Sequence, residues 1–164
     1  MNLSEILESI SNLFDFALMN SLNELRMVDI GVIDAELASK IAENTGYLTE
    51  NYIVSIDSFG IKHSMNGHSV SNEVLANQIG ITKNDFLLLH QIIFSADNII
   101  KGIKHKNTQP DTIFFEKTIK NKYEVVLEIR MISGKKKALY KKNRLILKNM
   151  YICEYWVKNT EIVS

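Results

Sequence analysis

The sequence predicts an α+β fold, with helices in the N-terminal half and a C-terminal antiparallel four-stranded meander on which these helices pack. Three observations support this prediction. Apolar residues recur at helical spacing before residue 104, short β-branched runs separated by turn pairs follow residue 111, and the only proline, Pro110, lies in the loop between them. The length of 164 residues suffices for one domain, or for one domain with an added helical segment.

The first elements follow from local signals. Apolar residues at three- and four-residue steps predict an amphipathic helix over residues 3–25. Asp34 as the N-cap and Gly46 as the stop predict a second helix over "AELASKIAEN". The β-branched run "NYIVSI" then predicts a strand at residues 52–56.

Two further helices are expected before the sheet. Asp57 caps "SFGIKHSMN", and Gly67 is expected to end this helix after about two turns. Thr82 and Asp85 form a variant of the capping box at the start of a longer helix. A broad apolar face then continues to Ile103.

Four strand-like runs make up the predicted meander: "TIFFEKTI", "KYEVVLEIRM", "KKKALYKK" and "RLILKNMYIC". Short turns between sequential strands favour antiparallel pairing. In the second run one alternate set is apolar and the other is mostly polar and includes Arg130. We therefore expect the helices to cover the apolar face and the polar face to stay wet.

The composition indicates a cytoplasmic protein without a membrane partner. The single cysteine, Cys153, excludes an intramolecular disulfide and suits a reducing compartment. The N-terminus "MNLSEILESISNLFDF" lacks the basic start of a signal peptide. No apolar run has the length that a bilayer requires.

Charge is divided unevenly along a chain whose formal net charge is zero. Residues 1–58 contain ten acidic and two basic residues, whereas residues 101–150 contain 14 basic and 4 acidic ones. This separation indicates a surface that attracts polyanions, although a solvated charged face explains it equally well.

Two close histidines, His63 and His68, carry the chemical signal. Two residues that are five positions apart do not lie on the same face of a helix, and no set of cysteines accompanies these histidines. We therefore expect no metal and no cofactor. Histidine titrates near neutrality and serves as either base or acid. With Arg130 and the basic hairpin "GKKKALYKKNR", this set suits RNA cleavage by 2′-hydroxyl attack. The alternative is that the histidines are surface or core residues.

The stretches "GIKHSMNGH", "ITKNDFLLLHQII" and "LILKNMYI" resemble the phage-associated branch of the Barnase–EndoU–colicin–RelE-like nucleases. The resemblance covers roughly residues 50–153. It implies a small metal-independent RNase of the prophage or toxin type over residues 50–164. Residues 1–49 then form an acidic helical segment that masks the basic face or binds a partner. A cognate inhibitor protein is a further partner that the resemblance implies.

The resemblance also implies the site. His63 and His68 match the family's histidine pair, and Arg130 matches its basic residue on a middle strand. Asn149 stands in "KNMY" where a threonine is common. On this interpretation His63 is the base and His68 the second proton carrier, or the reverse.

The remaining residues of the implied site bind the substrate. Lys137 joins Arg130 in holding the scissile phosphate, with Lys135 or Lys136 as substitutes for it. Asn149 and Tyr151 line the site.

Two other functions stay open at this point. A non-catalytic nucleic-acid-binding or phage accessory protein keeps the fold and binds RNA through lysines alone. An interaction module uses the stripe of residues 3–25 as a homodimer seam, whereas ordinary packing on the chain's own core is the simpler explanation. A nuclease needs the histidine pair, and a binder does not.

Overall fold

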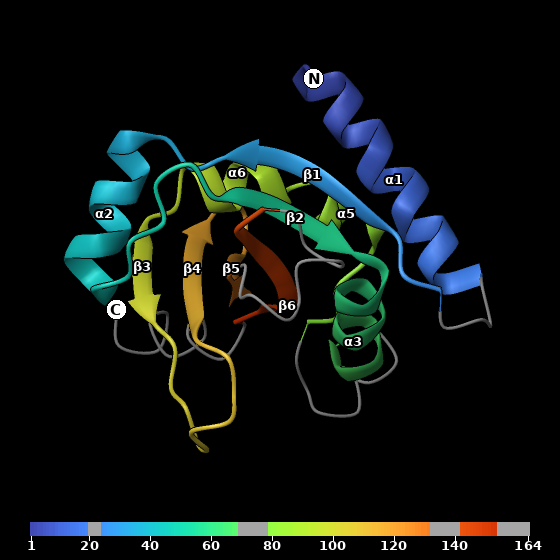
Figure 1. Ribbon diagram of the computed structural model, residues 1–164. Coiled ribbons are helices and arrows are strands. Elements are labelled where there is room, and N and C mark those ends of the chain that lie inside the picture. The colour runs from blue at the N-terminus through green and yellow to red at the C-terminus, as the bar shows by residue number, and fades with distance from the viewer. Residues whose placement is uncertain (20–23, 69–78, 132–141, 154–164) are drawn as a thin grey trace, which may run out of the picture.

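The computed structural model describes residues 1–19, 24–68, 79–131 and 142–153 (Figure 1). Six strands form one sheet in the order β1-β2-β6-β5-β4-β3. The strands are β1 (Met27–Val32), β2 (Ile53–Asp57), β3 (Asn98–Lys101), β4 (Thr112–Thr118), β5 (Lys122–Arg130) and β6 (Arg144–Ile152). All neighbours pair antiparallel except β2 and β6, which are parallel.

The described helices are α1 (Leu3–Met19), α2 (Ala35–Thr45), α3 (Ser58–His68), α5 (Lys83–Phe86) and α6 (Leu89–Phe94). Helix α6 packs on β4 and β5, α2 packs on β3, and α1 contacts β1, α3 and α5. In Figure 1, α2 stands on one side of the molecule and α1 with α3 on the other.

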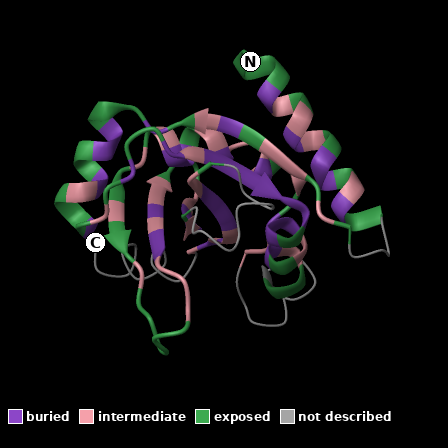
Figure 2. Ribbon diagram, in the orientation of Figure 1, coloured by how far each residue is buried: buried purple, intermediate pink, exposed green. Residues whose placement is uncertain are grey.

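The hydrophobic core lies between the sheet and these helices, and it draws on nearly every element. Figure 2 shows the buried positions of α1 on its inner side and an almost wholly buried β2. The core includes Ile10 from α1, Ile41 from α2 and Phe86 from α5, all with no exposed surface. The predicted division between residues 49 and 50 therefore falls within a continuous core, and it stays a prediction.

Local signals at the helix ends behave as predicted. Asp34 accepts the backbone N–H of Leu37 at 2.8 Å, and Gly46 ends α2 at φ 80°. At the start of α5, Asp85 accepts the backbone N–H of Thr82 at 2.7 Å. These caps satisfy N–H groups that a helix start leaves unpaired.

Helix α3 takes the place of β2 beside β6. Strand β2 ends at Asp57, and α3 follows at once and packs along β6. Gly60 makes this approach possible, because a Cβ atom there would overlap the carbonyl oxygen of Leu147. The helix continues through Gly67 to His68, so the expected stop at Gly67 is wrong. Gly67 faces open space and is tolerated in the last turn.

The four-stranded meander is corrected to a six-stranded mixed sheet. Strands β4, β5 and β6 follow the predicted antiparallel order, but β6 also pairs with β2, and β1 and β3 extend the two edges. The strand expected at 135–142 falls largely outside the described residues. The helix expected to reach Ile103 ends at Phe94, and residues 98–101 form β3 because they pair with β4.

Candidate functional site on the polar sheet face

One face of β5 and β6 carries a set of polar side chains, interrupted by Val126 and Ile146, which we call the polar face. It consists of Glu124, Glu128, Arg130, Arg144, Asn149 and Tyr151. Paired residues of an antiparallel ladder project to the same side. The register of β5 with β6 thus brings Arg130, Asn149 and Tyr151, three residues of the predicted site, to one surface.

This surface is less exposed to solvent than the sequence predicts. Glu124 is only 8% exposed and Val126, next to it on the same side, is 6% exposed. The expectation of a solvated second face is therefore wrong for the middle of β5. Carboxylates on this face are held in a partly desolvated environment, where charge interactions are stronger than in water.

Arg130 lies at the end of β5 in a group of alternating charges. Its Nη2 donates to Oε2 of Glu128, and Oε1 of Glu128 lies 3.7 Å from Nζ of Lys148. The side chain of Arg130 is 40% exposed, and its Nε has no hydrogen-bond partner in the described part of the chain. Because this Nε is buried, the exposed part of the guanidinium is the part that an anion can reach.

Asp57 links this group to α3. Its Oδ1 accepts the backbone N–H of Gly60 at 2.7 Å and so caps the helix. Burial raises the pKa of the Asp57 carboxyl, while the hydrogen bond from Gly60 and the nearby charge of Arg130 act in the opposite direction. Helix α3, which Asp57 caps, packs along β6, and β6 is the antiparallel partner of β5.

A second polar group surrounds Glu124. The Tyr151 hydroxyl donates to Oε1 of Glu124, and the Cys153 Sγ lies 3.8 Å from Oε2. Glu116 lies opposite on β4, and its Oε2 is 3.5 Å from Nζ of Lys122. Burial raises the pKa of Glu124 and also that of Tyr151. Burial and the charge of Glu124 raise the pKa of Cys153 to about 11, so its thiol stays protonated at neutral pH.

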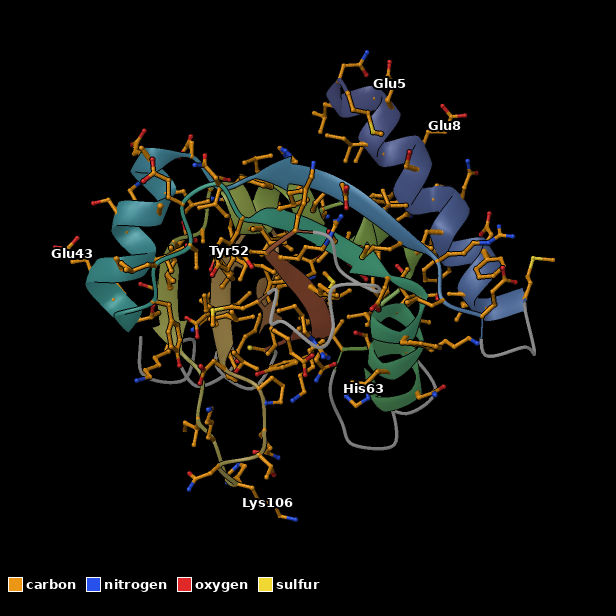
Figure 3. All side chains as sticks on the ribbon, viewed as in Figure 1. Glu5, Glu8, Glu43, Tyr52, His63 and Lys106 are labelled. Atoms are coloured by element: carbon orange, nitrogen blue, oxygen red, sulfur yellow. The ribbon has the colours of Figure 1, made fainter. Side chains whose placement is uncertain are left out.

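The histidines belong to α3, which packs along β6. His63 is exposed and forms no hydrogen bond, ion pair or ring contact within the described residues. Figure 3 shows it on the lower half of α3, on the side nearer the strands. His68 is the last residue of the helix rather than a residue beyond it. The side chains of His68, Lys135, Lys136 and Lys137 lie outside the described residues.

Arg144 ties three strands together at one end of the polar face. Its Nη1 donates to Oδ1 of Asp29 on β1 and to Oγ of Ser55 on β2, the latter at 2.8 Å. Ser55 in turn donates to Oδ1 of Asp29 at 2.8 Å. This network fixes the start of β6 against β2 and β1.

Sequence reasoning did not single out the carboxylates of Asp57, Glu124 and Glu128 as site residues. Glu124 and Glu128 alternate with Arg130 along β5, which places them on its face. Their burial depends on distant elements, for which the sequence offers no signal. Among the described residues, no group of three or more His, Cys, Asp or Glu side chains is placed to hold a metal ion. No described helix is long and apolar enough to cross a membrane.

In this α+β fold, one face of the sheet carries cations and carboxylates, and a helix that bears histidines packs beside it. Together these elements supply the groups that phosphodiester cleavage requires. Residues 31–155 match the family model of the phage-Barnase-EndoU-ColicinE5/D-RelE like nuclease3 domain, PBECR3. The chain therefore belongs to this family of nuclease-like domains, which confirms the suspected relationship and the general class of nuclease. No curated protein and no solved structure matched the chain.

Proposed function

We propose that the protein is a metal-independent endoribonuclease of the toxin or prophage type. It cleaves RNA by attack of the 2′-hydroxyl on the adjacent phosphate and leaves a 2′,3′-cyclic phosphate. The observation that supports this most is the partly exposed Arg130 side chain on the same face as Asn149 and Tyr151. A guanidinium in this setting binds the phosphate oxygens on which charge develops.

Histidines supply the proton transfers in this proposal. His63 is the base that accepts the 2′-hydroxyl proton, and His68 gives a proton to the leaving 5′-oxygen; the reverse assignment uses the same groups. The exposed and unpaired imidazole of His63 has the access to substrate that a base needs. Lys137, with Lys135 and Lys136 as substitutes, adds positive charge at the phosphate.

The proposal is tested with purified protein on a defined RNA. Cleavage is expected to persist in excess chelator, to spare DNA of the same sequence, and to leave a cyclic phosphate on the 5′ fragment. His63→Ala and His68→Ala should each lower the rate by about 10²–10⁴-fold with unchanged thermal unfolding. His90→Asn is the matched control, because His90 packs 4.6 Å from the Phe94 ring on α6. Cleavage that requires a divalent metal would overturn the mechanism.

A second candidate is a non-catalytic nucleic-acid-binding or phage accessory protein. Asn149 favours it, because an amide stands where relatives commonly have a threonine, and its Oδ1 accepts the backbone N–H of Met150 at 2.9 Å. Binding of RNA without cleavage in any buffer would support this candidate. Asn149→Thr is then the decisive variant, since restored cleavage would assign the defect to this residue.

A further inference from the structure

The loop between β3 and β4, residues 102–111, projects beyond the body of the protein. Figure 2 shows its outer part as exposed, and Figure 3 places Lys106 at its far end. Lys101 precedes it, and the loop itself carries Lys104, His105 and Lys106. No acidic residue occurs from Asn98 to Pro110, and Asp111 at the end of the loop is its one carboxylate, so this projection keeps an excess of positive charge.

Hydrogen bonds within the loop hold it in a defined shape. The Oε1 of Gln109 accepts the backbone N–H groups of His105 at 3.0 Å and Lys106 at 3.3 Å. The backbone N–H of Gln109 donates to the carbonyl oxygen of Lys106 at 3.0 Å. A preformed loop loses less conformational entropy when it binds a ligand than a disordered tail does.

The base of the loop is fixed by a different group of contacts. Nζ of Lys104 lies 2.8 Å from Oδ1 of Asp111, and the hydrogen bond from Lys104 lowers the pKa of Asp111. The Nζ of Lys101 lies 5.4 Å from the centre of the Tyr47 ring. Among the described residues neither Lys101 nor Lys106 forms an ion pair, and both side chains are exposed to solvent, although the charge of Lys101 also acts on Asp111.

The loop begins beside the proposed site. The backbone N–H of Ile129 donates to the carbonyl oxygen of Asp111 at 2.9 Å, which places the base of the loop next to Arg130. The chain segment with Lys135–Lys137 connects Arg130 to Arg144, which are cross-strand partners at this same end of the sheet. Two lysine-rich connections therefore leave the sheet where Arg130 lies.

We propose that the β3–β4 loop is an RNA-binding arm that holds the phosphate backbone of single-stranded RNA next to the polar face. Lys101 and Lys106 contact successive phosphates, while Lys104 keeps the base of the loop in place through Asp111. The proposal rests on the nuclease function above. It assigns the binding of the flanking nucleotides to the β3–β4 loop, which is separate from the reacting groups. Such contacts carry no base specificity, because phosphates are the same at every position.

The test uses an RNA oligonucleotide in which every 2′-hydroxyl is methylated, because this probe binds but cannot undergo 2′-hydroxyl attack. Fluorescence anisotropy measures its affinity for the Lys101→Gln/Lys106→Gln variant over a range of salt concentrations. The matched control is Lys40→Gln/Lys120→Gln, which removes the same charge from exposed lysines of α2 and of the turn between β4 and β5. Thermal unfolding of all three proteins verifies that the fold is intact.

The loop variant should bind about tenfold more weakly near 0.1 M salt, and its slope of log affinity against log salt should be shallower by about one unit. The control should bind as the unaltered protein does. Equal weakening in both variants would overturn the proposal, because net charge alone would then explain binding. A loop variant that binds as tightly as the unaltered protein would also overturn it.

The result is separable from the proposed chemistry. A protein that cuts ordinary RNA but whose loop variant binds the methylated probe normally refutes the RNA-binding arm alone. Conversely, a protein that binds the probe through the loop but cuts no RNA refutes the catalytic proposal and leaves the arm in place.

Discussion

Glu124 shows how a single residue on the polar face couples stability to pH. Burial raises its pKa in the folded state, so the folded protein holds this proton more tightly than the unfolded chain does. Stability from this group is therefore greatest at low pH, and it is lost as pH rises from the ordinary glutamate range through the raised value.

The corresponding prediction concerns Glu124→Gln. Its amide oxygen still accepts the Tyr151 hydroxyl, but no charge is buried. The variant should need more urea to unfold than the unaltered protein at pH 7.5, and this advantage should shrink as pH falls from the raised pKa of Glu124 to the ordinary glutamate pKa. Glu43→Gln, at an exposed position of α2, is the control and should show no such trend. An advantage that is the same at every pH would contradict the role of the buried charge.

Asp57 gives a second prediction at this scale. Asp57→Ala removes the side chain that accepts the Gly60 N–H and should cost about 0.5–2 kcal/mol of unfolding free energy. Asp57→Asn keeps an acceptor oxygen and should stay within about 0.5 kcal/mol of the unaltered protein. Urea denaturation at neutral pH measures both. Equal losses in the two variants would show that the charge next to Arg130, and not the cap, is what matters.

The residues of the site differ in how far the sequence could predict them. Arg130 was placed on the polar face of β5 by simple alternation, and the structure confirms that placement. Asn149 and Tyr151 follow the same rule, although a bulge between Val126 and Leu127 shifts the register by one residue. The desolvation of Glu124 depends on elements that are remote in sequence, and alternation alone does not reveal it.

At the scale of elements, the close contact between α3 and β6 makes a sharp prediction. Gly60→Ala would place a methyl group against the carbonyl oxygen of Leu147, and backbone on both sides cannot move away freely. The variant should lose roughly 1–3 kcal/mol of unfolding free energy. Gly67→Ala is the matched control in the same helix, where nothing lies within 4 Å, and it should gain about 0.5 kcal/mol. A neutral Gly60→Ala would show that α3 does not pack this closely.

Elements with local start and stop signals were the predictable ones. Asp34 and Gly46 bound α2 by their own chemistry, and Thr82 with Asp85 starts α5. Residues 98–101 resemble a continuing helix because Ile99 and Ile100 extend the apolar spacing, yet pairing with β4 makes them a strand. Strand β1 was missed because Asp29 and Gly31 weaken its local signal. Pairing with β2 stabilises the strand conformation that the intrinsic propensity of these residues does not favour.

For the whole molecule, α1 is predicted to belong to the core rather than to a dimer seam. Ile10 has no exposed surface, so Ile10→Ala should cost about 2–5 kcal/mol. Leu3 in the same helix is 55% exposed, and Leu3→Ala should cost less than about 0.5 kcal/mol. The unfolding midpoint should not depend on protein concentration. A midpoint that rises with concentration would support the homodimer instead.

The parallel pairing of β2 with β6 also has a consequence for synthesis of the protein. Strand β6 lies in the middle of the sheet, between β2 and β5, although it is the last of the described strands in sequence order. A growing polypeptide on the ribosome therefore cannot join β1 and β2 to β3, β4 and β5 until β6 has been synthesised. Arg144, Asn149 and Tyr151 arrive with that same strand, so a nascent chain that stops before Arg144 lacks these residues of the candidate site. The residues of the candidate site that lie on β6 therefore join those of β5 only after β6 has been made.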